Sequence, residues 1–141
     1  MTDEEVDEFL ASAGYGTLAF AGDPPYAVPM SYGFDPEERV AYVHMGAFAG
    51  SEKMDRLEES SSVSLVVSRY RGPDQWRSAV VDGTLHPISS RELDDGDALE
   101  AFSAGDLASI TLFDRDPGTV SFEWDALDPT AITGRRSHRP L

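Results

Sequence analysis

Apolar residues near the N-terminus recur with the period of an α-helix. Four of them have the i, i+3, i+4, i+7 spacing that places side chains on one helix face: Val6, Phe9, Leu10 and Ala13. Thr2 and Glu5 have the spacing of a capping box, and Gly14 stands where a helix would end. The pattern therefore predicts an amphipathic helix over residues 3–13.

The rest of the chain contains short apolar stretches separated by turns rich in Gly, Pro and Asp, which is typical of strands. We predict strands over residues 17–21, 26–34, 39–45, 62–68 and 76–88, the last bent at Gly83, and further strands near 119–124 and 130–133. Helices are predicted over residues 52–59 and 91–103. Hairpin-linked strands with helices between them indicate a mainly β fold of the α+β class, with the strands in an antiparallel barrel. We expect a single domain over residues 1–141, in which residues 135–141 form a basic tail.

Pro29 interrupts the second predicted strand. Proline has no N–H to donate to a strand ladder. Its presence indicates a strand edge, a bulge, or backbone that something other than a strand approaches.

The charge balance narrows the class of partner. The chain has 26 Asp and Glu against 11 Lys and Arg, a formal net charge of -15, and this charge would repel a nucleic-acid backbone. The absence of cysteine excludes disulfides and thiolate metal sites, and the histidines lack metal-ligand spacing, so we expect no metal. No apolar run is long enough to cross a membrane, and we expect a cytoplasmic protein. Lys53 is the one lysine, a composition typical of halophilic proteins.

One loop contains the residues of a candidate anion site. A strand leads into small residues between Gly46 and Gly50, and Ser51 and Lys53 follow at the start of the next predicted helix. Backbone N–H groups at a helix start attract anions, and Lys53 would add a positive charge. The same residues also suit an ordinary strand–loop–helix junction capped by Ser51.

The order of four motifs extends this interpretation. They are Val-Pro-Met-Ser-Tyr-Gly at 28–33, Val-Ala-Tyr-Val-His at 40–44, Gly-Ser-Glu-Lys at 50–53 and Trp-Arg-Ser-Ala-Val-Val-Asp-Gly at 76–83. In this order the chain resembles the pyridoxamine 5'-phosphate oxidase-like, FMN-binding split β-barrel proteins. The resemblance implies a homodimer with FMN in a groove between two barrels. The chain lacks the long arginine-rich C-terminal segment of true pyridoxamine phosphate oxidases, so that reaction is not expected.

The resemblance also implies roles for individual residues. It places four residues beside the flavin ring, with backbone groups of the last two bonding the ring edge: Val28, Pro29, Met30 and Ser31. It places Ser51 and Lys53 at the phosphate, Trp76 near the subunit interface, and Arg135 where relatives carry a basic residue after a Thr-Gly pair. His44 is either a structural histidine at the end of an apolar strand or a polar group over the flavin pocket.

The expected function is that of an FMN flavoprotein that moves electrons between a reduced nicotinamide and a small acceptor. Two alternatives use the same fold: a deazaflavin-dependent oxidoreductase and a non-enzymatic flavin-binding module. Haem binding would need an axial ligand, for which His44 and His86 are the candidates away from the tail.

Overall fold

A computed structural model describes residues 1–47, 55–57, 60–88 and 121–138, with the backbone alone for 44–47 and 121–123. The helix predicted over 91–103 lies outside the described residues, as does most of the one predicted over 52–59. Within the described part of the chain, no helix is long and apolar enough to span a membrane.

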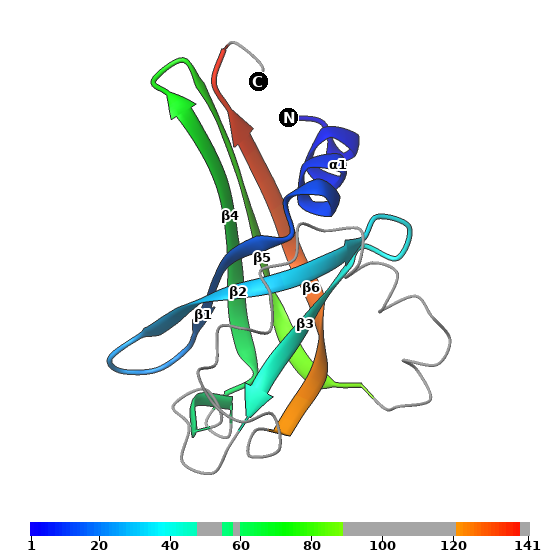
Figure 1. The fold of residues 1–141 in the computed structure, drawn as a ribbon, viewed down its shortest axis with the longest axis vertical. Helices are drawn as coiled ribbons and strands as arrows, with labels where there is room; N and C mark the ends of the chain where they lie inside the picture. Colours follow the sequence, from blue (N-terminus) through cyan, green and yellow to red (C-terminus); the bar gives the residue numbers. More distant parts are fainter. Residues whose placement is uncertain (48–54, 58–59, 89–120, 139–141) are drawn as a thin grey trace.

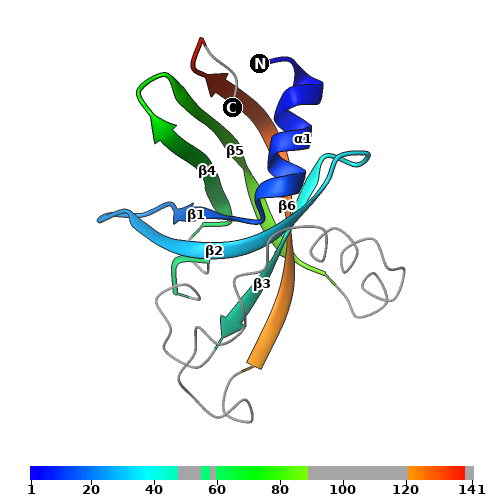
Figure 2. The same ribbon diagram turned by 45° about the horizontal axis from the view of Figure 1, so that its top comes forward.

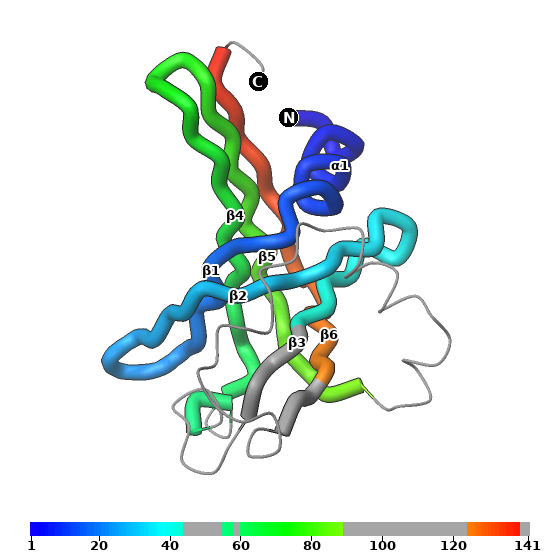
Figure 3. The backbone as a smooth tube through the Cα atoms, viewed as in Figure 1, coloured from blue at the N-terminus to red at the C-terminus, as the bar shows by residue number. Residues whose placement is uncertain are grey.

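One complete helix, a helical segment at 55–57 within the second predicted helix, and six antiparallel strands make up the described fold (Figures 1 and 3). In chain order they are α1 (Asp3–Ala13), β1 (Tyr15–Phe20), β2 (Tyr26–Asp35), β3 (Val40–Ala47), β4 (Ser62–Gly72), β5 (Gln75–Pro87) and β6 (Ser121–Arg136). The strands close into a barrel in the order β1-β2-β3-β6-β5-β4, because β1 pairs with both β2 and β4. The predicted antiparallel barrel is therefore confirmed.

The barrel core follows from the two-residue period of its strands. Alternate side chains of a strand point to the same face, and one face is apolar in each strand. On β4 and β5 the inward positions are buried, at Val63, Leu65 and Val67 and at Ala79 and Val81. Four side chains of α1 add its apolar face to this core: Val6, Phe9, Leu10 and Ala13. The helical spacing in the sequence thus identified the buried face of α1.

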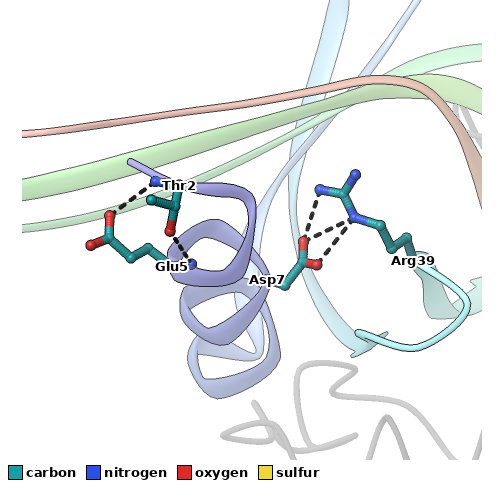
Figure 4. A network of polar contacts seen from close by, with 4 residues as sticks. All are labelled: Thr2, Glu5, Asp7 and Arg39. Atoms are coloured by element: carbon teal, nitrogen blue, oxygen red, sulfur yellow. Dashed lines mark hydrogen bonds and ion pairs between the residues drawn. The ribbon is translucent and has the colours of Figure 1, made fainter.

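Local backbone chemistry fixes both ends of α1. The Glu5 N–H donates to the Thr2 hydroxyl at 3.1 Å, and the Thr2 N–H donates to the Glu5 carboxylate at 3.0 Å (Figure 4). This reciprocal pair satisfies two N–H groups that a helix start leaves without partners. Gly14 ends the helix with a φ of 74°, a conformation that costs glycine little. The predicted helix and both of its ends are confirmed.

Two long-range contacts attach the β2–β3 hairpin to α1. The Tyr32 hydroxyl donates to the Leu10 carbonyl at 2.7 Å inside the core, and burial raises the pKa of Tyr32. Arg39 donates from Nε and Nη2 to both carboxylate oxygens of Asp7, at 2.9–3.1 Å (Figure 4). This two-pronged bond also holds Arg39 at a φ of 55°, which is unfavourable for a residue with a side chain. The hairpin is therefore tied to α1 at two points.

The end of the chain differs from the sequence prediction. The strands predicted near 119–124 and 130–133 are parts of one 16-residue strand, β6, which also includes Arg135 and Arg136 from the expected tail. The strand continues past Pro129 because the β5–β6 register shifts at Gly83, which lies opposite Pro129. A Cβ on Gly83 would lie 2.1 Å from the Asp128 carbonyl oxygen, so the bulge requires glycine there. The predicted bend at Gly83 is this bulge.

Replacing Tyr32 with Phe tests the attachment of the hairpin to α1. The variant leaves the buried Leu10 carbonyl without its donor, so we expect the free energy of unfolding to fall by about 1–2 kcal/mol. Tyr15→Phe is the matched control because Tyr15 is 45% exposed, and its effect should stay within about 0.5 kcal/mol. Chemical denaturation of the three proteins measures both values. Equal stabilities for Tyr32→Phe and Tyr15→Phe would show that the hydroxyl does not hold the hairpin.

Candidate functional site

The strands β2 and β3 separate partway along their length. They pair from Asp35–Val40 to Tyr32–Val43, while β2 pairs with β1 as far as Tyr26. From His44 to Ala47, β3 pairs with β6. Figures 1 and 2 show β3 diverging from β2 toward the barrel end that is opposite the β4–β5 hairpin tip. The first half of β2 and the second half of β3 are therefore not paired with each other, and we call this unpaired stretch the opening.

The direction of the β2 backbone determines what faces this opening. The Tyr32 N–H donates to the Gly14 carbonyl at 3.1 Å, so hydrogen-bonded pairs with β1 fall at every second residue before it, including Met30 and Val28. Ala27 and Pro29 alternate with these and direct their backbone groups toward the opposite edge. The missing N–H of Pro29 therefore lies on the edge that faces the opening. Of the three explanations that the sequence left open for Pro29, the strand edge is the one observed.

Four of the candidate residues are consecutive on this edge. Val28 is half-buried, Pro29 is exposed, and Met30 and Ser31 are 6% and 8% exposed. By the same alternation, Ser31 directs its backbone away from β1, whereas the backbone of Met30 faces β1. The sequence analysis expected backbone contacts from Met30 and Ser31 to the flavin ring; the Met30 backbone faces β1, whereas the Ala27 backbone faces the opening.

For the remaining candidates at this end, the structure gives the backbone of His44 alone. The backbone of His44 pairs with Trp124 of β6, just beyond the point where β3 leaves β2. Ser51 and Lys53, the expected phosphate-binding pair, lie outside the described residues. Asp125, which the sequence analysis did not single out, is a carboxylate only 5% exposed, opposite Val43. The sequence alone does not show that Asp125 occupies an inward-facing strand position, because this depends on the register of β6.

Trp76 and Arg135 lie together elsewhere in the fold. The Trp76 N–H donates to the Ser137 hydroxyl at 3.1 Å, the Ser137 N–H donates to the Trp76 carbonyl at 2.9 Å, and Arg135 pairs with Ser78. These residues border a groove of about 470 Å³ lined by Met1, Trp76 and residues 134–138. In Figure 1 this end of β5 and β6 lies by the β4–β5 hairpin tip, at the opposite end of the barrel from the opening. Within one chain, the structure does not bring them to β2.

Metal ligands are not gathered anywhere in the described part of the chain. No three His, Asp or Glu side chains there lie close enough to hold an ion. His86, a candidate haem ligand, is about half exposed, with Nδ1 3.1 Å from the Asp128 carboxylate.

Comparison with known proteins gives a family and a set of similar folds. The family model described as pyridoxamine 5'-phosphate oxidase matches residues 2–136. A FAD-binding protein from Mesorhizobium loti has 20% sequence identity and a TM-score of 0.75, covering 97% of this chain and 96% of that one. A FAD-binding protein from Mycobacterium smegmatis has 19% identity and a TM-score of 0.68, with coverage of 97% and 96%.

A heme-binding protein from Mycobacterium smegmatis is also similar, at 17% identity and a TM-score of 0.70, covering 96% of this chain and 54% of that one. A comparison with curated proteins gives no match. At these identities the structural similarities establish the shared fold.

Proposed function

The chain belongs to the pyridoxamine 5'-phosphate oxidase family, and we propose that it is a flavin-binding protein that holds FMN noncovalently in the opening between β2 and β3. Two similar structures are those of FAD-binding proteins, which supports a flavin as the class of ligand. We propose FMN because the candidate anion site at Ser51 and Lys53 would suit a single terminal phosphate.

The observation that carries the proposal is the β2 edge at Ala27–Ser31. A flavin ring is planar and has both carbonyl acceptors and an N–H donor along one edge. The outward-facing backbone of Ala27 and Pro29 offers the N–H of Ala27 and the C=O groups of both residues. A proline in the middle lacks one donor and prevents another strand from completing the ladder there. The edge therefore suits a planar ligand better than it suits a seventh strand.

The position of Trp76 and Arg135 supports a homodimer. Trp76 was expected near the subunit interface, and both residues lie at the other end of the barrel from β2 in the same chain. A two-fold dimer would resolve this, because each protomer can present its Trp76 end to the β2 edge of its partner. In this arrangement each flavin site is complete only when the second copy is present.

The chemistry proposed for the site is two-electron transfer. When bound, the flavin would supply the redox centre that passes electrons from a reduced nicotinamide to a small acceptor. The protein's part is to bind the ring along the β2 backbone and to exclude water with the buried side chains of Met30 and Ser31. The favoured location is the cytoplasm, in keeping with a reduced nicotinamide as electron donor.

Purified protein should therefore bind FMN, with an absorption spectrum of two flavin bands and FMN as the mass of the released chromophore. Lys53→Ala should weaken FMN binding about 10- to 100-fold, because a charged hydrogen bond contributes about 1.5–3 kcal/mol. Arg71→Ala removes an equal charge from an exposed position in the β4–β5 hairpin and should leave affinity unchanged.

Three results would count against this proposal. Protein that neither contains nor takes up a flavin would refute flavin binding. Released FAD or deazaflavin would refute FMN while keeping the ligand class. Equal FMN affinities for Lys53→Ala and Arg71→Ala would remove Lys53 from the phosphate site.

Mixing two defective variants tests whether the site is shared between protomers. Lys53→Ala and Arg135→Gln should each bind FMN weakly. If Lys53 and Arg135 act at one site from different protomers, exchange of subunits recreates one intact site in each mixed dimer, so about one quarter of all sites should recover wild-type affinity. Fluorescence titration of the mixture measures this fraction. Mass spectrometry should confirm that mixed dimers form. If they form and no site recovers wild-type FMN affinity, then either Lys53 and Arg135 act within one protomer or Arg135 is not part of the flavin site.

A further inference from the structure

Three arginines form one row across three neighbouring strands. Arg69 of β4 lies opposite Arg77 of β5, and Arg77 lies opposite Arg136 of β6. Side chains at directly opposite positions share a face and have Cβ atoms about 4.5–5.5 Å apart. Arg77 is two residues before the buried Ala79 and Arg69 is two residues after the buried Val67, so the row lies on the core-facing side of the sheet.

This arrangement places like charges side by side with little compensation. Directly opposed like charges destabilise a sheet. In the described part of the chain, the one carboxylate paired with the row is Glu5 of α1, whose Oε2 is 3.8 Å from Arg136 Nε. Arg69 and Arg77 have no carboxylate partner among the described residues. Three positive charges therefore face one negative charge, in a protein whose net charge is -15.

Arg77 lies at the centre of the row and has an unsatisfied donor. Its guanidinium carbon lies 4.8 Å from the centre of the Phe9 ring, an attractive cation–π contact that fixes the side chain. Its Nε is buried and has no hydrogen-bond partner. A buried N–H without an acceptor costs free energy comparable to a lost hydrogen bond. Among the described residues, Arg77 thus lacks both an acceptor for its Nε and a carboxylate partner.

From these observations we propose that the row Arg69–Arg77–Arg136 binds a small oxyanion, specifically a phosphate group, between α1 and the end of the β4–β5–β6 sheet. A phosphate supplies what the row lacks: negative charge and several acceptor oxygens. Guanidinium groups match phosphate geometry with paired N–H donors, and their fixed plane favours such an anion over chloride. Part of the site is open to ligand, since the side chain of Arg136 is 40% exposed.

The row lies at the same end of the barrel as Trp76 and Arg135, and Arg136 also borders the groove that these two residues line. Arg136 and Arg77 lie on the sheet face that packs against α1, as a Cβ on Gly134 would lie 2.5 Å from Val6. Arg135 and Trp76 alternate with them and direct their side chains to the other face. The row also lies at the opposite end of the barrel from the β2–β3 opening. Because this end of the barrel also completes the proposed flavin site in a dimer, the test compares phosphate with FMN.

Titration with inorganic phosphate, followed by NMR at the arginine Nε–H groups, tests the proposal. In about 0.1 M KCl, where the Debye length is about 10 Å, we expect a saturable shift of the Arg77 Nε–H signal. Arg77→Gln and the more exposed Arg136→Gln should each weaken phosphate binding by about tenfold or more, as measured by calorimetry. Arg71→Gln is the control, because it removes the same charge from an exposed position in the β4–β5 hairpin and should bind phosphate like the wild type.

Several outcomes would overturn the proposal. They are an Arg77 signal unmoved by phosphate, an equal response to chloride, or equal losses of phosphate affinity in Arg71→Gln and Arg77→Gln. A signal that changes with protein concentration, and not with phosphate, would show that a second copy of the chain covers the row. A signal that FMN itself moves would assign the row to the flavin. The wild-type titration decides the matter even if Arg77→Gln fails to fold.

Discussion

Beyond the pair Tyr32–Val43, β2 continues with β1 as its partner and β3 with β6, so the barrel is joined at one end of these strands and open at the other. Contacts with α1 hold the joined end. The Tyr32 hydroxyl bonds to the helix backbone inside the core, and Arg39 bonds to Asp7 just beyond the strand pair. Because the hairpin is held from that side, the first half of β2 can leave β3 without unravelling the sheet. The proposed flavin site depends on this separation.

Much of this architecture was predictable from local sequence. The capping box of Thr2 and Glu5 and the stop at Gly14 determine α1 through contacts within a few residues, and the helix is observed as predicted. Pro29 likewise indicated an irregular position in the second strand, because a proline lacks a backbone N–H whatever strand lies beside it. The strands near the C-terminus were divided wrongly, since Pro129 normally ends a strand. A bulge opposite Gly83 accommodates it, and a bulge depends on a partner strand 46 residues away in sequence.

The functional surfaces depend more strongly on such distant pairings. The row of Arg69, Arg77 and Arg136 exists because two strand registers place three unrelated positions side by side. No spacing along the chain identifies it. The buried position of Asp125 and the distance of Trp76 from β2 follow from register for the same reason. Family resemblance correctly named the fold, and the site residues that it implied lie at both ends of the barrel within one chain.

Hydrogen exchange of the β2 backbone amides, measured with and without FMN, tests the central claim most directly. If the flavin ring lies along the edge that faces the opening, FMN should slow exchange at Ala27 by about tenfold or more. The amides of Val28 and Met30 face β1 and should exchange at the same rate in both states, which makes them internal controls. Slowing at Val28 and Met30 alone, or equal rates throughout β2 with FMN bound, would contradict a flavin on this edge.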